Sequence, residues 1–261
     1  MTKSIEKPLI LVVNDDGITA PGIRALIHQM NSLGNVYVVA PDAPQSGMGH
    51  AITLNAMLRV NQLRIDDGPQ VEYSCSGTPV DCVKIACTSL LPRKPDLIVS
   101  GINHGANSSI NVLYSGTMSA AMEGALEGIP SVGFSLLDHS IDANFKPSLK
   151  YCKKIAANML SNAMPKGTCL NVNIPAIPTE AIKGVKVCRQ ANGNWEESFD
   201  KRIDPSGNAY YWLTGKFVNY DKGEDTDIWA LEHNYISIVP VQFDITAHHS
   251  IQEFNNWDYH V

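Results

Sequence analysis

The sequence lacks the features that mark membrane proteins and nucleic-acid-binding proteins. None of its apolar runs reaches the roughly 18–20 residues that a helix needs to cross a bilayer. The N-terminal segment MTKSIEKPLI has no apolar core followed by a small-residue cleavage site. Basic residues number 20 against 26 acidic ones and form no run, which argues against a surface for nucleic acid. We therefore expect a cytoplasmic protein that has neither a membrane nor a nucleic-acid polymer as a partner.

Three common active-site motifs are absent as well. There is no GxxxxGK[ST] loop, no GxGxxG after the first apolar run and no GxSxG segment. These absences argue against P-loop, dinucleotide-binding and nucleophile-elbow enzymes. The six cysteines include no CxxC pair, and most have apolar neighbours, as Cys82 and Cys169 do. The sequence therefore predicts buried free thiols rather than disulfides or a zinc site.

Short apolar runs alternate with stretches of helical periodicity over the first two thirds of the chain. The first unit is an apolar run at 8–13, a helix from Pro21 that ends near Gly34, and a second run at 36–40. The alternation continues with helices from Thr78, at 115–126 and at 149–160, and with strands at 96–100, 131–136 and 169–174. It predicts an α/β fold: a three-layer α/β/α, Rossmann-like arrangement around a mostly parallel sheet.

The sequence changes character after about residue 185. Residues 208–219 and 235–241 are typical of antiparallel strands, whereas 189–207 is polar and poorly periodic and is expected to form a long loop or arm. We therefore expect residues 1–185 to form a catalytic α/β core. Residues 186–261 are expected to form a β-rich C-terminal extension of the same domain.

Oxygen-bearing side chains follow the expected strands, where ligands bind in open α/β sheets. Asp15 and Asp16 follow the first strand, and the loops after the next two strands contribute Ser46 and Asn103. Such hard ligands suit Mg²⁺, Mn²⁺ or Ca²⁺, and a dication would offset the repulsion between the two aspartates. For the aspartate pair alone, a helix cap and a solvated carboxylate are the commoner explanation. The neighbouring oxygen-rich loops favour the metal.

The segment Tyr114-Ser115-Gly116-Thr117 opens an expected helix and is a candidate phosphate site. The free backbone N–H groups and the dipole at a helix start attract anions, and two hydroxyls add donors. An ordinary helix cap is the alternative. A metal beside an anion site points to phosphoryl transfer or phosphate hydrolysis.

Two histidines, His50 and His104, lie in the same loops and are candidates for acid–base work or substrate contact. A structural role is the commoner one for such residues. The pair at 248–249 lies outside these loops and is expected to be structural or interfacial.

Five blocks occur in a fixed order over most of residues 9–136: VNDDGITAPGI, VVAPDAPQSGMGHAITL, SGTPVDCV, PDLIVSGINHGAN and YSGTMSAAMEGALEGIPSVGFS. Together they resemble the SurE family (stationary-phase survival protein) of metal-dependent nucleotidases. The resemblance implies one divalent ion per subunit, Mg²⁺ or Mn²⁺, with Ca²⁺ as a substitute in crystals. It implies removal of phosphate from nucleoside 5′- and 3′-monophosphates, and in some members from short polyphosphate. It also implies a homodimer or homotetramer, with the C-terminal extension as the oligomerisation arm.

The family's site residues can be carried over to this sequence position by position. The resemblance makes Asp15, Asp16, Ser46 and Asn103 the metal ligands. The two aspartates then act in catalysis through the ion and its water, although Asp16 as general base or as nucleophile stays open. The residues expected beside the substrate and its phosphate are Asn14, Gly47, Asn107, Ser115, Gly116 and Thr117.

This chain departs from the family pattern in one segment. Residues 108–113 read SSINVL where some members have a glycine and acidic residues, and His104 stands where a smaller residue often precedes the glycine. Substrate preference and loop conformation are therefore open.

Two alternatives from other functional classes fit the sequence less well. A signalling receiver module has paired aspartates after its first strand, but it needs an aspartate at the end of the third strand and a later lysine. Here the third strand ends in residues 100–103, SGIN, and the chain is about twice the usual size. A metal-binding protein with a decayed site is the other alternative, and the intact oxygen ligands argue against it.

Overall fold

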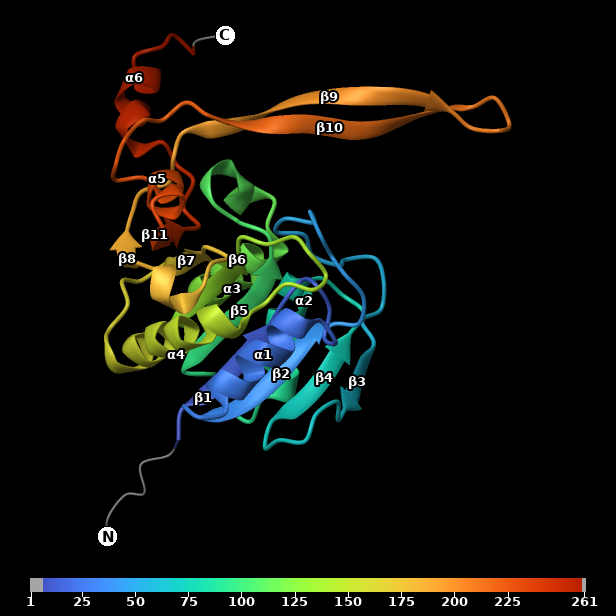
Figure 1. Ribbon diagram of the computed structural model, residues 1–261, viewed down its shortest axis with the longest axis vertical. Helices are drawn as coiled ribbons and strands as arrows, with labels where there is room; N and C mark the ends of the chain where they lie inside the picture. The colour runs from blue at the N-terminus through green and yellow to red at the C-terminus, as the bar shows by residue number, and fades with distance from the viewer. Residues whose placement is uncertain (1–6, 260–261) are drawn as a thin grey trace.

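A nine-stranded sheet forms the centre of the computed structural model, which describes residues 7–259. Most of the N-terminal segment examined for a signal peptide lies outside these residues. The strand order is β3-β4-β2-β1-β5-β6-β7-β11-β8 (Figure 1). Its strands are β1 (Leu9–Val13), β2 (Asn35–Pro41), β3 (Val60–Leu63), β4 (Val71–Cys75), β5 (Leu97–His104), β6 (Ser131–Leu136), β7 (Thr168–Ile174), β8 (Gly184–Val187) and β11 (Tyr235–Gln242).

Parallel pairing joins the strands from β4 through β7, as the alternation of helices and strands predicted. Strand β3 runs antiparallel to β4, and β11 runs antiparallel to β7. The principal helices are α1 (Pro21–Met30), α2 (Pro79–Ile85), α3 (Gly116–Leu126), α4 (Lys146–Ser161), α5 (Asp227–Glu232) and α6 (Ile251–Asn255), and shorter helical segments are η1 (Ala86–Leu90), η2 (Ser109–Leu113), η3 (Thr179–Ala181) and η4 (His248–Ser250).

Strand β1 contributes side chains to two hydrophobic clusters, one on each face of the sheet. All five of its residues are buried, and alternate side chains point to opposite faces of the sheet. Ile10 and Val12 join the cluster that includes residues of α1 and α4, whereas Leu11 and Val13 join the cluster that includes residues of α2 and α3. Helices therefore cover both faces, and the predicted three-layer α/β fold is confirmed.

The start of α1 approaches the sheet closely. Pro21 occupies the first turn of the helix, where a missing N–H costs nothing. At the next position, a Cβ on Gly22 would lie 2.0 Å from the carbonyl oxygen of Ile102 in β5. Only glycine permits this approach, which brings α1 onto the strand that carries Asn103.

The C-terminal part differs from the expectation in two respects. Residues 235–242 do not belong to an appendage: they form β11, which enters the large sheet between β7 and β8. The expected boundary at 185/186 falls inside β8. Residues 189–207, expected as a loop, contain strand β9 (Gly193–Ile203), which pairs with β10 (Ala209–Asn219). These two strands project from the body as a long arm (Figure 1).

The expectation of buried free thiols is met. All six cysteines are free, and five of them are buried, as their apolar neighbours predicted. Among the helices of residues 7–259, none combines the length and apolar character required to span a bilayer.

Candidate active site

The carboxyl ends of β1 and β5 meet the start of α3. Thr117 donates a hydrogen bond of 2.5 Å from its hydroxyl to Asp15 Oδ1. Asp16 Oδ2 accepts from the backbone N–H of His104 at 3.2 Å and lies 3.0 Å from its Nδ1. The backbone N–H of Gln45, beyond β2, donates to the carbonyl of Asp15 at 2.7 Å. The loop after β2, the end of β5 and the start of α3 therefore all contact the aspartate pair directly.

The two aspartates differ in their surroundings. Asp15 is almost fully buried, and desolvation raises the pKa of its carboxyl to about 6, with the neighbouring charge of Asp16 adding to the rise and the hydrogen bond from Thr117 opposing it. Asp16 is more accessible, with 19% of its side chain exposed. Burying one carboxylate next to another is costly, so the pair favours a positively charged partner.

Asn103 offers a side-chain oxygen that the protein itself leaves unused. Its amide nitrogen donates to the backbone carbonyls of His104 and Gly105, at 3.1 and 2.8 Å. Both amide hydrogens are thereby used. The amide oxygen makes no hydrogen bond within the described part of the chain, so it is free to act as a ligand.

Ser46 is exposed, and it lies in a loop that is held by hydrogen bonds from its neighbours. Its neighbour Gln45 bonds to Asp15, and Gly49 N–H donates to the carbonyl of Tyr114 at 3.2 Å. His50 Nε2 lies 2.9 Å from Glu123 of α3. These contacts attach the loop to the same elements that hold the aspartates, although no contact joins the Ser46 hydroxyl to them. The contact of His50 with Glu123 is of the structural kind that was the commoner alternative.

The start of α3 has the ordinary cap that was the alternative to a phosphate site, and it also lies against Asp15. Ser115 Oγ accepts from the backbone N–H of Met118 at 3.0 Å, which is an ordinary helix cap. A Cβ on Gly116 would lie 2.7 Å from the Cβ of Asp15, so the first turn of the helix abuts the aspartate. The cap and the approach to Asp15 together place an anion-attracting helix end beside the carboxylate pair.

The two other expected asparagines have different environments. Asn14 donates to the carbonyl of Gly17 at 2.8 Å, and its side-chain oxygen is buried without a partner, which suits contact with a ligand. Asn107 is also buried, but its amide donates to Ser135 Oγ at 2.8 Å and its backbone N–H to Asn173 Oδ1. The contacts of Asn107 are therefore with β6 and β7 rather than with the aspartates.

The donor set fits a hard dication. It combines the carboxylates of Asp15 and Asp16 with the free amide oxygen of Asn103 and the orphaned oxygen of Asn14. Over residues 7–259 there is no cluster of three or more His, Cys, Asp or Glu side chains that could hold a metal. An ion held here would therefore depend on two carboxylates supplemented by neutral oxygens.

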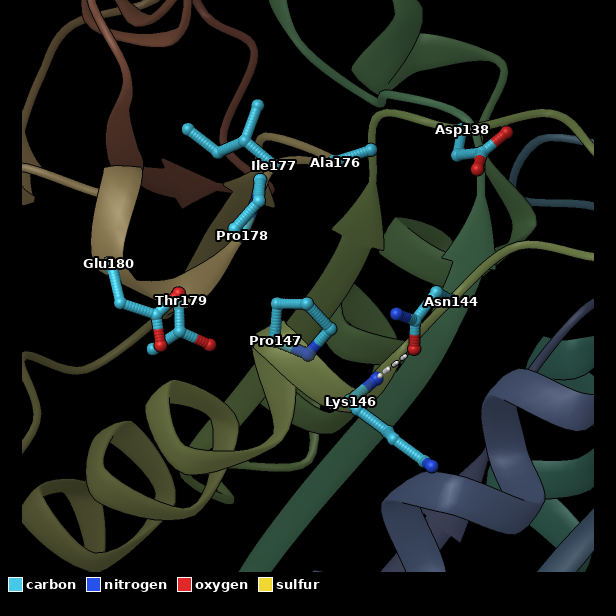
Figure 2. Close-up of a pocket in the computed structure, with 9 residues that line it drawn as sticks. All are labelled: Asp138, Asn144, Lys146, Pro147, Ala176, Ile177, Pro178, Thr179 and Glu180. Atoms are coloured by element: carbon cyan, nitrogen blue, oxygen red, sulfur yellow. Dashed lines mark hydrogen bonds between the residues drawn. The ribbon is translucent and has the colours of Figure 1, made fainter.

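Of the cavities near this edge of the sheet, two differ in their relation to the expected site residues. One, of about 410 Å³, lies beyond β6 and β7 and is lined in part by Asp138, Lys146 and Glu180 (Figure 2). None of the expected site residues lines it. The other, of about 680 Å³, has Gly47 and Tyr114 on its wall together with residues of β9 and β10. The second cavity adjoins the candidate site.

The family model described as survival protein SurE matches residues 10–197. The chain belongs to the SurE family. A 5′-nucleotidase SurE from Flavobacterium psychrophilum is 62% identical over 254 residues, covering 97% of this chain and 99% of the relative. One from Christiangramia forsetii is 64% identical over 253 residues and 97% of both chains.

A solved SurE structure shares the fold over nearly the whole chain. The crystal structure of the SurE protein from Aquifex aeolicus superposes with a TM-score of 0.82 at 40% identity, covering 95% of this chain and 98% of that one. The resemblance stated from the five sequence blocks is therefore confirmed. The SurE fold here includes the mostly parallel sheet together with the two-stranded arm.

The residues of the arm that line the second cavity of this SurE chain were not predicted from its sequence. Trp195 and Glu197 line the cavity beside Tyr114, yet they lie in the stretch interpreted as a loop. A tryptophan in an otherwise polar segment was the one signal that could have singled them out.

Proposed function

We propose that this chain hydrolyses nucleoside 5′-monophosphates to nucleoside and phosphate with one divalent ion per subunit, Mg²⁺ or Mn²⁺. The 5′-nucleotidase names of its full-length relatives support this activity. The observation that carries it is the buried Asp15 beside Asp16, at the start of α3. Activity on 3′-monophosphates and short polyphosphate belongs to the same proposal.

Different residues would bind the ion and orient the phosphate. Asp15, Asp16, Ser46 and Asn103 would hold the ion. When bound, such an ion stabilises charge on phosphoryl oxygens and lowers the pKa of a water molecule. The N–H groups at the start of α3 would orient the phosphate, with Thr117 fixing Asp15 and the orphaned oxygen of Asn14 facing the site. Gly47 and Asn107 would border the substrate without contacting the aspartates.

The test is phosphate release from a panel of nucleoside 5′- and 3′-monophosphates with Mn²⁺, with Mg²⁺ or with EDTA. We expect turnover of 5′-monophosphates that requires the metal. Folded protein that binds Mn²⁺ and yet releases no phosphate from any nucleotide would refute the proposal.

His104 is expected to position Asp16. Its Nδ1 lies 3.0 Å from the carboxylate, its ring packs edge-on against Phe145 at 5.0 Å, and its Nε2 is buried without a partner. Because a partner that orients a metal-binding side chain is worth about 10- to 100-fold in metal affinity, His104→Ala should weaken Mn²⁺ binding by that factor. His104→Asn, which can still donate to Asp16, should retain most of the affinity. Calorimetric titration measures both, and equal affinities for the alanine variant and the unmodified protein would contradict this role.

We also propose that the arm joins copies of this chain into a homodimer or homotetramer. The arm leaves large side chains such as Phe199, Tyr211 and Trp212 more than half exposed, which a lone chain would not favour. We propose the cytoplasm as the compartment, which the six free thiols support.

A further inference from the structure

The cavity of about 680 Å³ between the arm and the body continues from the candidate phosphate site. Gly47 on its wall directly follows Ser46, and Tyr114 directly precedes Ser115. The opposite wall is the base of the arm, with Trp195, Glu197, Leu213 and Gly215. A group attached to a phosphate at Ser115 would therefore enter this space. The volume is within the range of small-molecule sites.

Trp195 presents a fixed aromatic surface to this cavity. Its indole Nε1 donates to Asn111 Oδ1 at 2.7 Å, and its ring makes an edge contact with Phe217 at 6.0 Å. The side chain nevertheless keeps 39% of its surface exposed. An aromatic ring that is held in place and still accessible binds a flat ligand without first losing rotamer freedom.

The base of the arm is itself fastened to the loop beside the phosphate site. The buried carboxylate of Asp227 accepts from the backbone N–H of Ser109 at 2.8 Å and from that of Ala191 at 2.9 Å. Ser109 Oγ also donates to the carbonyl of Ala191 at 2.9 Å. The position of Trp195 is thereby set relative to the loop that leads to Tyr114.

Glu197 adds a hydrogen-bond acceptor on the same face of β9, two residues from Trp195. Its partner across the arm is Gly215, which has no side chain to cover it. No described residue pairs with its carboxylate or hydrogen-bonds to it. A free carboxylate favours a ligand edge that donates hydrogen bonds and disfavours an edge that accepts them.

We propose that this cavity is the nucleobase subsite, with Trp195 as the stacking surface and Glu197 as the residue that selects the base. The proposal rests on the nucleotidase function proposed above. Guanine offers two adjacent donors, N1–H and the N2 amino group, to a carboxylate. Adenine offers one donor beside an acceptor. The subsite therefore favours guanosine over adenosine monophosphate.

The stacking role is tested with Trp195→Ala, and with ribose 5-phosphate as a substrate that has no base. Stacking of a base on an aromatic ring corresponds to about a 5- to 150-fold effect. We expect KM for guanosine 5′-monophosphate to rise by that factor with kcat little changed, and both constants for ribose 5-phosphate to stay within about twofold. Trp195→Phe, which keeps a ring, should restore most of the loss. Trp257→Ala is the matched control, because Trp257 is 58% exposed and lies outside both the arm and the lining of this cavity.

The selectivity role is tested with Glu197→Gln. The ratio of kcat/KM for guanosine over adenosine monophosphate should fall at least about fivefold, since a bidentate base contact discriminates by that much or more. An unchanged ratio would overturn the role of Glu197. A Trp195→Ala variant that slows ribose 5-phosphate as much as nucleotides would overturn the subsite. Absence of hydrolysis of every nucleotide by the unmodified protein would instead refute the proposed function.

Discussion

Asp16→Asn is expected to reduce phosphate release from nucleoside 5′-monophosphates by about 1,000-fold or more. The substitution keeps the size of the side chain and removes one of two negative charges at the site. The charge stabilisation that a bound dication supplies is worth several kcal/mol, and each 1.36 kcal/mol is a factor of ten in rate. Steady-state kinetics in Mn²⁺, together with calorimetric titration of Mn²⁺, measures the two effects separately.

Asp142→Asn is the control for that experiment. Asp142 is an exposed aspartate in the loop after β6, so it carries the same charge change without contacting the site. Its activity and its Mn²⁺ affinity should match those of the unmodified protein. An Asp16→Asn protein that retains a tenth or more of the activity would show that the reaction does not depend on this carboxylate.

Arg24→Ala is expected to destabilise the protein by about 3–5 kcal/mol. Arg24 of α1 forms a two-point contact with Glu72 of β4, at 2.7 and 2.8 Å, and also binds Asp66. The side chain of Glu72 is only 2% exposed. Removing the arginine leaves an uncompensated buried charge, which is the costly way to break an ion pair. The free energy of unfolding in urea measures the loss.

Arg64→Ala is the matched comparison, because Arg64 pairs with Asp67 where both side chains are largely exposed. Its effect should stay within about 0.5 kcal/mol. The double change Arg24→Met with Glu72→Leu replaces the buried pair by apolar groups, and it should recover much of the stability. A loss below 1 kcal/mol for Arg24→Ala would contradict the importance of this contact.

The same contact explains why the edge of the sheet formed by β3 and β4 was not predicted from the sequence. Residues 71–75 place a glutamate at a buried strand position, which breaks the apolar pattern of a central strand. The arginine that compensates it lies 48 residues earlier, on α1. Periodicity within a short window cannot show such a pairing, so β3 and β4 were not predicted. The apolar runs of β1, β2, β6 and β7 needed no distant partner and were predicted closely.

Strand β9 of the arm was not predicted from the sequence for a different reason. Strand β9 packs on no core, since ten of its eleven residues are exposed, so no buried face imposes an alternation of polar and apolar residues. Its structure comes from pairing with β10, and the sequence stretch looked like a loop. For the same reason, the residues of β9 that line the cavity with Tyr114 were not predicted.

The candidate metal ligands could be proposed from the sequence because they lie at, or a few residues beyond, the carboxyl ends of expected strands. The topology of a parallel sheet brings such positions to one edge whatever the loops contain. The detailed roles depended on contacts that spacing does not specify. Asn107 was expected at the phosphate, and its amide is instead bonded to Ser135, a contact set by the register of β6.

Asn103 donates both of its amide hydrogens to backbone carbonyls. This arrangement affects the net charge of the site. An aspartate at this position could not donate to those carbonyls and would be repelled by them. Two carboxylates balance a dication to electrical neutrality, whereas three would leave one negative charge in excess. A phosphate dianion would then approach a repulsive centre. As a ligand, the proposed carboxamide would supply an oxygen without a charge, and a site loaded with a dication would then be neutral and open to a doubly charged substrate.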